Sequence, residues 1–385
     1  MVEFQQIMKK KIKRGKILII SSQRPYNGGM STTAYNLRKV LNNDFEVYSL
    51  FFNTENQNAD PDKIGRVFQM SYRDSNYLKK LLLLFGIKAQ HIESIIFKYC
   101  ILKLMWQSGL RPDLIITNVP DFILKVNSLF KRVKKIFIVN GCSPLEMVCS
   151  EQRDFSSILN SSNYSDILEK IAFLKFNQLN NASVIFNSEI TKQLFYHLGI
   201  YNGSSKAHFF NIIPQNLIVR KTFDQRKYDI GFVVSNQSRN VKNVKLAKTI
   251  FGRFPNNPKI VIGAGVNLFS NLPNTECYHS LSQNQVMEFL NDVRVLIVTS
   301  YFDSSPGIQA EAIYMGANVL TSRNVGWNSL FDANCVVENY FNLEEWVQKI
   351  SYLKNHYCEN DGFKKVTTEA TESIVGTIKN IYNKM

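Results

Sequence analysis

Short apolar runs alternate along this chain with stretches in which apolar residues recur at helical spacing. Such runs are typical of strands buried on both faces of a parallel sheet, because neither face meets water. The runs that we interpret as strands are residues 15–21, 45–52, 113–117, 135–141, 182–188, 228–234, 259–263, 276–279, 293–300 and 318–322. Helical spacing covers residues 34–41, 76–109, 190–198, 284–290 and 370–385, and the polar residues 53–70 are expected to form a loop. The alternation predicts an α/β fold.

The alternation is lost once, near residues 209–223, where Pro214 interrupts the pattern. We interpret this stretch as the crossing between two doubly wound, Rossmann-like domains. Ligands of open α/β sheets bind beyond the carboxyl ends of the strands, so two such sheets predict a site in an interdomain cleft. The expected domains are residues 1–212 and 213–368, followed by a helical segment over residues 369–385.

One strand–loop–helix–strand unit carries the strongest chemical signal. After the strand at 293–300 comes a loop of small residues, then a helix that starts near Gly307, carries Glu311 and ends at Gly316. Asp303 lies at the start of the loop. A helix N-terminus offers unpaired N–H groups to a phosphate, and a carboxylate one turn further in can accept hydrogen bonds from sugar hydroxyls. The unit therefore predicts a nucleotide-sugar site, the alternative being an ordinary βαβ unit with incidental acids.

This unit resembles the signature of retaining glycosyltransferases of family 4, the group 1 glycosyl transferases, which have the GT-B fold. Asp303 stands where that family usually has Glu, and Glu311 matches the second acid. The other positions in register are Gly307, Gly316, Val319 and Ser322. The resemblance extends over most of the chain. It implies two facing Rossmann-like domains with an interdomain cleft, an N-terminal acceptor side, a C-terminal nucleotide-sugar side, and a last helix that returns to the first domain.

The resemblance also implies roles for the residues of this unit. Glu311 would bind the ribose hydroxyls of the nucleotide, and Asp303 would contact or orient the donor sugar. Asp is one methylene shorter than the expected Glu, which limits its reach. The loop of residues 304–308 would offer backbone N–H groups to the donor phosphates, with Ser305, Gly307 and Ile308 as the donor-binding positions.

Two further loops match the family at the carboxyl ends of predicted strands. Gly28 and Gly29 precede the first helix, where the family's glycine pair reaches towards donor and acceptor, although the same residues also suit a plain turn. Lys242 occupies the family's diphosphate-binding lysine position, and a cation there offsets the charge of the leaving group. The usual arginine is absent, and Arg239 is the candidate substitute. The alternative for Lys242 is a solvated lysine at a helix start.

Asn140 and Gly141 end a strand of the first domain, where many relatives have a histidine near the transferred sugar. Asn can donate and accept hydrogen bonds but cannot titrate, which argues against histidine-based acid or base work. The loop containing Trp327 resembles a family loop that lines the base or sugar pocket; stacking and core packing are both open for this residue. A metal is not expected, since the sequence shows no ligand cluster and the only D-x-D, at residues 60–62, suits a surface turn.

The net charge and the apolar content of the chain limit the binding partners and the cellular location that we expect. The chain has 385 residues and a net charge of +15, with basic runs at residues 9–16, 79–80, 131–135 and 220–227. No apolar run is long enough to cross a bilayer, residues 1–16 lack the features of a secretory signal, and the six cysteines are scattered. We expect a cytoplasmic protein. The helical segment from Tyr77 to Trp106 mixes apolar and basic residues, so it either packs as a buried helix or lies on an anionic membrane, peripheral on the cytoplasmic face.

The expected function is a glycosyltransferase that moves a sugar from a nucleotide-diphosphate donor to an acceptor hydroxyl, with retention, in glycan, polysaccharide or glycolipid synthesis. The resemblance implies front-face substitution without a protein nucleophile or a cofactor. The expected partners are the nucleotide sugar, a glycan or lipid-linked acceptor and an anionic membrane surface; a nucleic acid is not expected. Two alternatives stay open: a nucleotide-sugar epimerase with the same fold, and a catalytically degenerate polyanion-binding protein.

Overall fold

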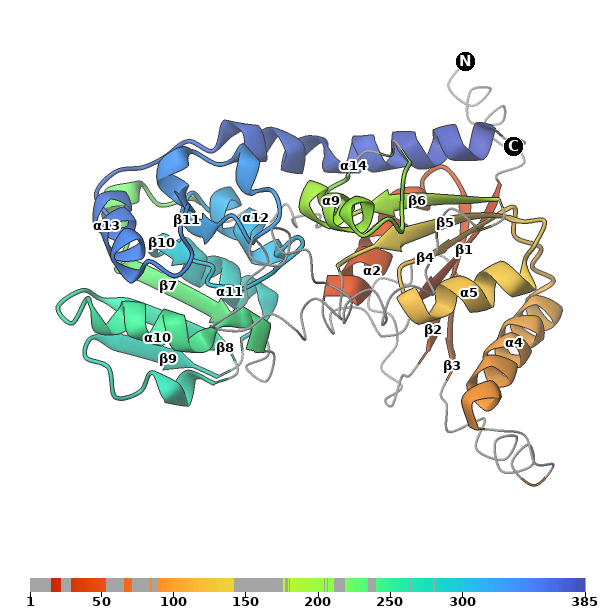
Figure 1. Cartoon of the computed structure of the whole chain (residues 1–385), viewed down its shortest axis with the longest axis horizontal. Coiled ribbons are helices and arrows are strands. Elements are labelled where there is room, and N and C mark those ends of the chain that lie inside the picture. The colour runs from red at the N-terminus through yellow and green to blue at the C-terminus, as the bar shows by residue number, and fades with distance from the viewer. Residues whose placement is uncertain are drawn as a thin grey trace, which may run out of the picture. The chain divides into compact units, whose positions relative to one another are not determined.

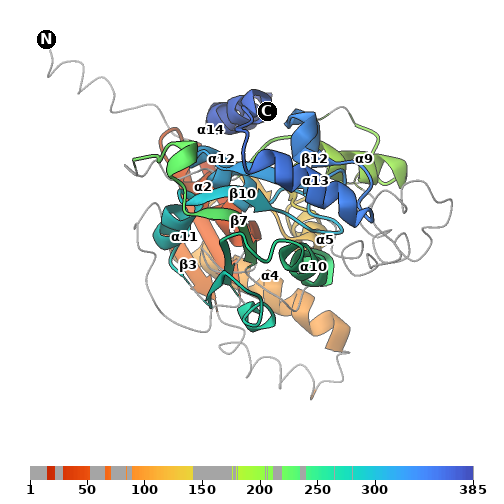
Figure 2. The same ribbon diagram turned by 90° about the vertical axis from the view of Figure 1, so that its left-hand side faces the viewer.

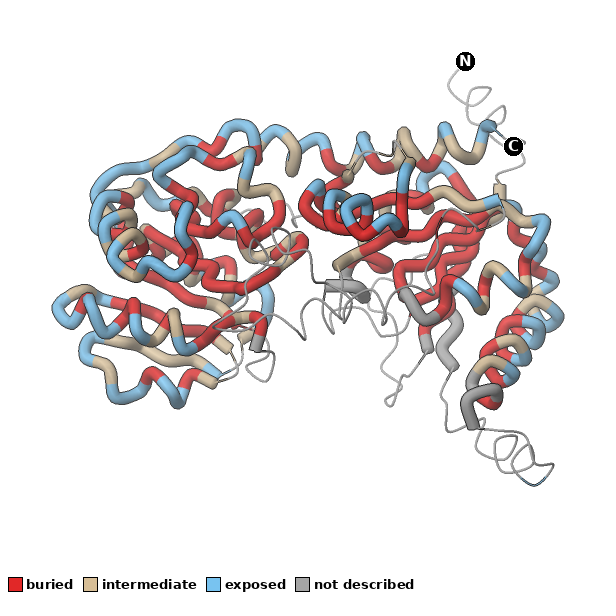
Figure 3. The backbone as a smooth tube through the Cα atoms, in the orientation of Figure 1, coloured by how far each residue is buried: buried red, intermediate tan, exposed pale blue. Residues whose placement is uncertain are grey.

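A computed structural model shows two parallel six-stranded sheets with helices around them (Figure 1). The structure describes residues 15–21, 29–52, 66–70, 84, 89–141, 176, 179, 181–203, 205, 207–210, 219–234, 240–263, 265–279 and 281–384. Most strands of both sheets are buried along nearly their whole length, as the colouring by burial shows (Figure 3). This burial explains why the strand sequences are continuous apolar runs rather than alternating ones.

The first sheet has the strand order β3-β2-β1-β4-β5-β6. Its strands are β1 (Lys16–Ser21), β2 (Glu46–Phe52), β3 (Arg66–Met70), β4 (Leu114–Thr117), β5 (Lys134–Val139) and β6 (Ala182–Phe186). The helices that follow its strands along the chain are α2 (Gly29–Leu41), α4 (Ala89–Ser108), α5 (Pro120–Leu129) and α9 (Glu189–His197). The expected loop over residues 53–70 is wrong at its end, because β3 pairs in parallel with β2 along all five of its residues.

The second sheet has the strand order β12-β11-β10-β7-β8-β9. Its strands are β7 (Tyr228–Val234), β8 (Lys259–Gly263), β9 (Thr275–Tyr278), β10 (Val293–Ile297), β11 (Asn318–Ser322) and β12 (Val336–Val337). The helices are α10 (Val244–Gly252), α11 (Gln283–Leu290), α12 (Gly307–Tyr314), α13 (Leu343–Leu353) and α14 (Asp361–Asn383). Figure 2 shows α10 with α13 on one face of this sheet and α11 with α12 on the other, and each pair is in contact. This is the doubly wound arrangement that the sequence predicts.

The chain packs as two compact units. The first comprises Met1–Ile138, Gln178–Ile185 and Val375–Met385, and the second comprises Val139–Asn177 and Phe186–Ile374. This division follows packing and not chain order, so the expected ranges 1–212, 213–368 and 369–385 stay predictions.

The end of α14 belongs to the first unit. Lys379 Nζ lies 2.8 Å from Asp44 Oδ1, and the ring of Tyr382 packs edge-on against Phe45 at 5.2 Å. These contacts fix the last turns of α14 on the turn that leads into β2.

Candidate functional site

The loop between β10 and α12 is fixed by backbone hydrogen bonds to two neighbouring loops. Tyr301 N donates to Val241 O at 2.7 Å, and Gly326 N donates to Asp303 O at 2.7 Å. Asp303 N donates in turn to Asn324 O at 3.2 Å. The loop is therefore positioned by the segment after β7 and by the segment after β11, both at the carboxyl ends of parallel strands, where α/β folds place ligands.

Helix α12 begins at Gly307 and ends as the sequence predicts. Pro306 is its N-cap, and the backbone turns left-handed at Gly316, with φ of +81°, directly after the C-cap residue Met315. The amides of Gly307 and Ile308 have no hydrogen-bond partner in the described part of the chain, as expected for the first turn of a helix. Ser305, Gly307 and Ile308 are partly exposed, whereas their neighbours Ser304 and Pro306 are buried. The predicted donor-binding positions thus face outwards at an amide-rich helix start.

Lys242 and Asp303 form an ion pair through Nζ and Oδ2. Both side chains are mostly buried, with 23% and 14% of their surface exposed. Lys242 ends a short 3-10 helix (Asn240–Lys242), and its carbonyl accepts a hydrogen bond of 3.1 Å from Thr299 Oγ1. The two residues that the resemblance assigns to the diphosphate and to the sugar therefore meet in one place, next to the start of α12.

Asn243, directly after Lys242, has a backbone conformation that suits Asn or Gly. Its φ is +44°, a left-handed conformation that Asn and Gly tolerate best. Its Oδ1 caps α10 by accepting from Leu246 N at 3.2 Å, and its Nδ2 donates to Tyr340 Oη at 2.7 Å. Tyr340 Oη donates to Thr299 O at 2.6 Å, so Asn243 holds Lys242 in place on two sides.

Glu311 is half-buried on α12, with its carboxylate next to the start of α11. Gln283 Nε2, from the first residue of α11, donates to Glu311 Oε1 at 3.1 Å. Burial raises the pKa of Glu311 above its ordinary value, and the hydrogen bond from Gln283 opposes that rise. A carboxylate that is partly desolvated and held by one amide keeps acceptor capacity for hydroxyl donors.

Asn140 comes directly after β5, and its side-chain amide is unsatisfied. Its side-chain Nδ2 and Oδ1 are buried and have no hydrogen-bond partner in the described part of the chain. Its backbone carbonyl accepts from Asn187 Nδ2 at 2.9 Å and from Ser304 Oγ at 2.6 Å. Gly141 follows with φ of +147°, which side-chain-bearing residues rarely adopt. An amide in this state has spare donors and acceptors for a hydroxylated ligand.

Asn187 is a residue that the sequence did not reveal. It follows β6 and is 5% exposed, and its Nδ2 donates both to Asn140 O and to Ser304 Oγ, each at 2.9 Å. Its Oδ1 accepts from Thr191 Oγ1 at 3.2 Å. Asn187 thus ties Asn140 to Ser304 of the loop before α12, within the second unit. The only available signal was its position near the carboxyl end of the apolar run at residues 182–188, which we interpret as a strand.

Trp327 fixes the same loop from the other side. Its indole Nε1 donates to Asn187 O and to Ser305 Oγ, each at 3.1 Å, and its ring packs edge-on against Phe209. Gly326 leaves no room for a side chain, because a Cβ there would lie 1.7 Å from Ser304 O. Stacking and core packing were left open for Trp327, and these contacts favour packing, which positions the loop.

Some predicted residues cannot be compared with the structure. Gly28, Arg239 and the D-x-D at residues 60–62 lie outside the described residues. Gly29 is described as the first residue of α2, so that helix starts earlier than the sequence pattern suggests.

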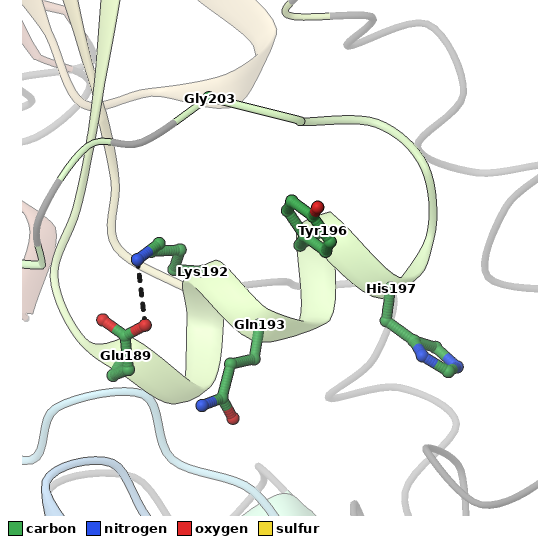
Figure 4. A pocket seen from close by; sticks show the side chains of 6 residues that line it. All are labelled: Glu189, Lys192, Gln193, Tyr196, His197 and Gly203. Carbon is green, nitrogen blue, oxygen red and sulfur yellow. Dashed lines mark hydrogen bonds and ion pairs between the residues drawn. The ribbon is translucent and has the colours of Figure 1, made fainter.

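The structure also shows an open depression of about 410 Å³ on α9, lined by none of the predicted residues (Figure 4). Its lining residues are Glu189, Lys192, Gln193, Tyr196, His197 and Gly203. In the described ranges, no group of three His, Cys, Asp or Glu side chains is placed to hold a metal ion. Nor does any helix of the described chain have the length and apolar character needed to cross a membrane.

Comparison with known proteins gives no match to a family model and none to a curated protein sequence. Solved structures do match along nearly the whole chain. The lipopolysaccharide outer core galactosyltransferase WaaB is 14% identical, with a TM-score of 0.63 over 96% of this chain and 100% of its own. Sucrose-phosphate synthase from Thermosynechococcus elongatus is 12% identical, with a TM-score of 0.67 over 96% and 99%.

A third match is an E. coli structure of trehalose-6-phosphate bound with UDP-2-fluoro glucose. It is 11% identical, with a TM-score of 0.60 over 96% of this chain and 99% of its own. At such low identity the likeness shows the fold alone. The predicted fold class is confirmed: the chain has the α/β architecture with two Rossmann-like domains, GT-B, that these structures share.

Proposed function

We propose that this protein is a glycosyltransferase that moves a sugar from a nucleotide-diphosphate donor to an acceptor hydroxyl. The observation that carries the proposal is the meeting of Lys242 and Asp303, 61 residues apart in sequence. They lie beside the first amides of α12, which have no hydrogen-bond partner among the described residues. A cation and free amides suit a diphosphate, and a carboxylate suits sugar hydroxyls. The GT-B fold, shared with sugar-transferring enzymes, supports the same assignment.

The donor would be held by three groups on the second sheet. Glu311, ionised when ligand is bound, would accept hydrogen bonds from the ribose hydroxyls. The amides of Gly307 and Ile308 would bind diphosphate oxygens, aided by the positive end of the helix dipole. Lys242 would turn from Asp303 towards the diphosphate, which offers a higher negative charge than a single carboxylate.

The reaction would be a front-face substitution with retention. The bond between the anomeric carbon and the diphosphate oxygen breaks, and the acceptor oxygen bonds to the same face of that carbon. The acceptor proton passes to a phosphate oxygen of the leaving group, so no protein nucleophile is needed. Lys242 and the α12 amides would stabilise the charge that grows on the diphosphate. Asp303 would orient the sugar, and the side-chain amide of Asn140, which has no hydrogen-bond partner among the described residues, would bind one of its hydroxyls.

Neither a metal nor a cofactor is part of this proposal, and the acceptor is a glycan or a lipid-linked glycan. The proposed location is the cytoplasm, where the protein would associate peripherally with the cytoplasmic face of a membrane. The proposed setting is glycan or glycolipid synthesis.

The test is a panel of nucleotide sugars scored by thermal shift, followed by an assay for free nucleotide and product. Glu311→Ala should abolish the donor-induced shift while the unliganded variant keeps its circular dichroism spectrum. Glu369→Ala, at an exposed acid on α14, is the matched control. NMR of the product anomer reads retention directly. Unchanged donor affinity in Glu311→Ala would refute the donor site, and epimerised donor without transfer would refute the transferase assignment.

A further inference from the structure

Helix α4 (Ala89–Ser108) is apolar on two opposite sides. One side packs into the first unit, and its buried residues are Ile92, Ile96, Phe97, Ile101 and Leu104. The other side carries four large apolar residues that remain in water, Ile95, Tyr99, Leu102 and Trp106, exposed by 36%, 51%, 51% and 85%. Figure 3 shows buried and exposed positions alternating along α4. A helix at the surface of a domain normally has a polar outer face, so this face is unusual.

The four exposed residues form one continuous stripe. Their spacings of four, three and four residues follow the helical repeat. At about 100° of rotation per residue, they fall within an arc of about 60°. Among the described residues of the first unit, the other exposed large apolar side chains are Leu84 and Leu124. The exposure is therefore concentrated on α4, and a concentrated apolar patch marks an interaction site.

Basic residues border this stripe on both sides. Lys98 and Lys103 lie about 70° to either side of its centre on the helical wheel. Lys103 is exposed and Lys98 is half-buried. The sequence of α4 contains one acidic residue, Glu93, and its position on the wheel is about 150° from the same centre. The outer face of α4 therefore has an apolar centre and a cationic border.

We propose that the outer face of α4 docks on an anionic lipid surface, with the helix parallel to the membrane plane. Trp106 and Tyr99 have an apolar ring and a polar tip, which suits the boundary between acyl chains and headgroups. Ile95 and Leu102 would enter the acyl region, and the two lysines would meet anionic headgroups. The chain's net charge of +15 adds a long-range attraction to such a surface.

Charge favours a lipid surface over a second copy of the chain. A symmetric pairing of two α4 faces repeats the same patch on both partners and places the lysine borders of both copies around one apolar seam. Those like charges would repel, whereas anionic headgroups neutralise them. The inference rests on the membrane association proposed above and names the surface that makes it. It does not use the donor site, so its test is independent of the transferase assignment.

Flotation of the full chain with vesicles tests the docking. The protein should bind mixed phosphatidylcholine–phosphatidylglycerol vesicles and bind phosphatidylcholine alone far more weakly. Leu102→Ser/Trp106→Ser should weaken binding to the mixed vesicles by about tenfold or more, through loss of apolar burial. Tyr196→Ser/Tyr352→Ser, which removes two exposed aromatic rings from other helices, is the matched control and should bind as the parent does.

Charge reversal tests whether Lys98 and Lys103 bind the membrane locally or act only through the net charge of the chain. Lys98→Glu/Lys103→Glu should abolish binding, while Lys39→Glu/Lys365→Glu, which changes the net charge equally at exposed positions of α2 and α14, should weaken it only slightly. Equal losses in the two variants would show that net charge alone acts, and would overturn the assignment to α4.

Brominated lipids report which residue enters the membrane. The chain has three tryptophans, and Trp106 is more exposed than the half-buried Trp327 and the buried Trp346. Brominated acyl chains should quench the parent protein, and Trp106→Phe should keep most of the binding but lose the quenching. Absence of vesicle binding, quenching that persists in Trp106→Phe, or a dimer in sedimentation that Leu102→Ser/Trp106→Ser dissociates would each overturn the proposal.

Discussion

Gln283 Nε2 donates a hydrogen bond to Glu311 Oε1 at 3.1 Å, linking the first residue of α11 to the acid proposed to bind ribose. The bond fixes one carboxylate oxygen, and the other accepts no hydrogen bond from the described residues. Gln283→Ala should weaken donor affinity by roughly fivefold, because one hydrogen bond to a partly buried group contributes about 1 kcal/mol. Isothermal titration calorimetry with the donor measures this change in affinity. Gln348→Ala, at an exposed glutamine of α13, is the control and should not change affinity.

Glu311 should lower the stability of the unliganded protein at neutral pH. Its pKa is raised above the ordinary value of 4.5, chiefly by burial, so the folded state favours the protonated acid. Ionising Glu311 therefore destabilises the folded state. This destabilisation is absent below the pKa of Glu311 in the unfolded chain and complete above its pKa in the folded chain. Stability therefore falls as pH rises through that window.

Glu311→Gln removes this dependence and should raise the melting temperature relative to the parent, more at about pH 8 than at about pH 4. The same variant should lose donor binding. Stability would thus rise as function is lost, the trade-off expected of a group buried for a ligand. A melting-temperature difference that does not change with pH would contradict the assigned burial cost.

Lys242 and Asp303 should be energetically coupled in the absence of donor. Each single replacement, Lys242→Met or Asp303→Asn, leaves a mostly buried partner without its counter-charge, whereas the double variant removes both charges. The double variant should therefore be less destabilised than the sum of the singles, with a coupling of about 1 kcal/mol after solvent screening. Urea unfolding of the four proteins measures the cycle.

Replacing Lys242 and replacing Asp303 should have different effects on the affinity for the nucleoside diphosphate. Lys242→Met should reduce affinity for the free nucleoside diphosphate by about tenfold or more, since a charge-assisted contact is lost. Asp303→Asn should keep that affinity and lower the transfer rate, because only the sugar is affected. Equal affinities for the diphosphate in the parent and Lys242→Met would contradict the role given to the lysine.

The fold could be predicted because its causes are local. Continuous apolar runs indicate strands that are buried on both faces, and Gly316 indicates the left-handed turn that ends α12. Candidate site residues could be named where one loop and the helix after it carry them, as with Asp303 and Glu311, and their roles stay predictions. Asn187 was missed because its role arises from contacts with Asn140 and Ser304, residues 47 and 117 positions away, which no local pattern encodes.

Two of the basic runs show the limit of reasoning from charge. Lys135 and Arg226 belong to two of the basic runs that contribute to the net charge, yet both are buried, at 0% and 4% exposure. Arg226 donates to the carbonyls of Leu290, Val293 and Met315, at the ends of α11 and α12 and at the start of β10. Sequence does not show whether a long cationic side chain turns outward to solvent or inward to backbone carbonyls.

Lys135 should make stability rise with pH in mildly basic solution. Its Nζ donates to Phe130 O at 2.7 Å and to Val133 O at 2.8 Å, and burial lowers its pKa from 10.5 to about 8. Between these values the unfolded chain binds a proton that the folded chain has released. The free energy of unfolding therefore increases with pH across this window. Urea unfolding should show the increase in the parent relative to Lys135→Met, and parallel pH profiles would contradict it.

Gly326 should be needed for the loop that presents Asp303. A Cβ at this position would lie 1.7 Å from Ser304 O, and backbone atoms cannot withdraw as a flexible side chain can. Gly326→Ala should therefore displace the loop, costing about 2 kcal/mol or more of stability as steric strain. Gly252→Ala is the matched control, because nothing lies within 4 Å of its added Cβ and its helical position favours alanine.

Donor titration then separates local displacement from general destabilisation. Well below the melting temperature, Gly326→Ala should stay folded but bind the donor at least about tenfold more weakly, because the α12 amides and Asp303 move together. Gly252→Ala should bind donor as the parent does and melt at an equal or higher temperature. If Gly326→Ala kept full donor affinity despite its lost stability, the loop before α12 would not be the place where the diphosphate binds.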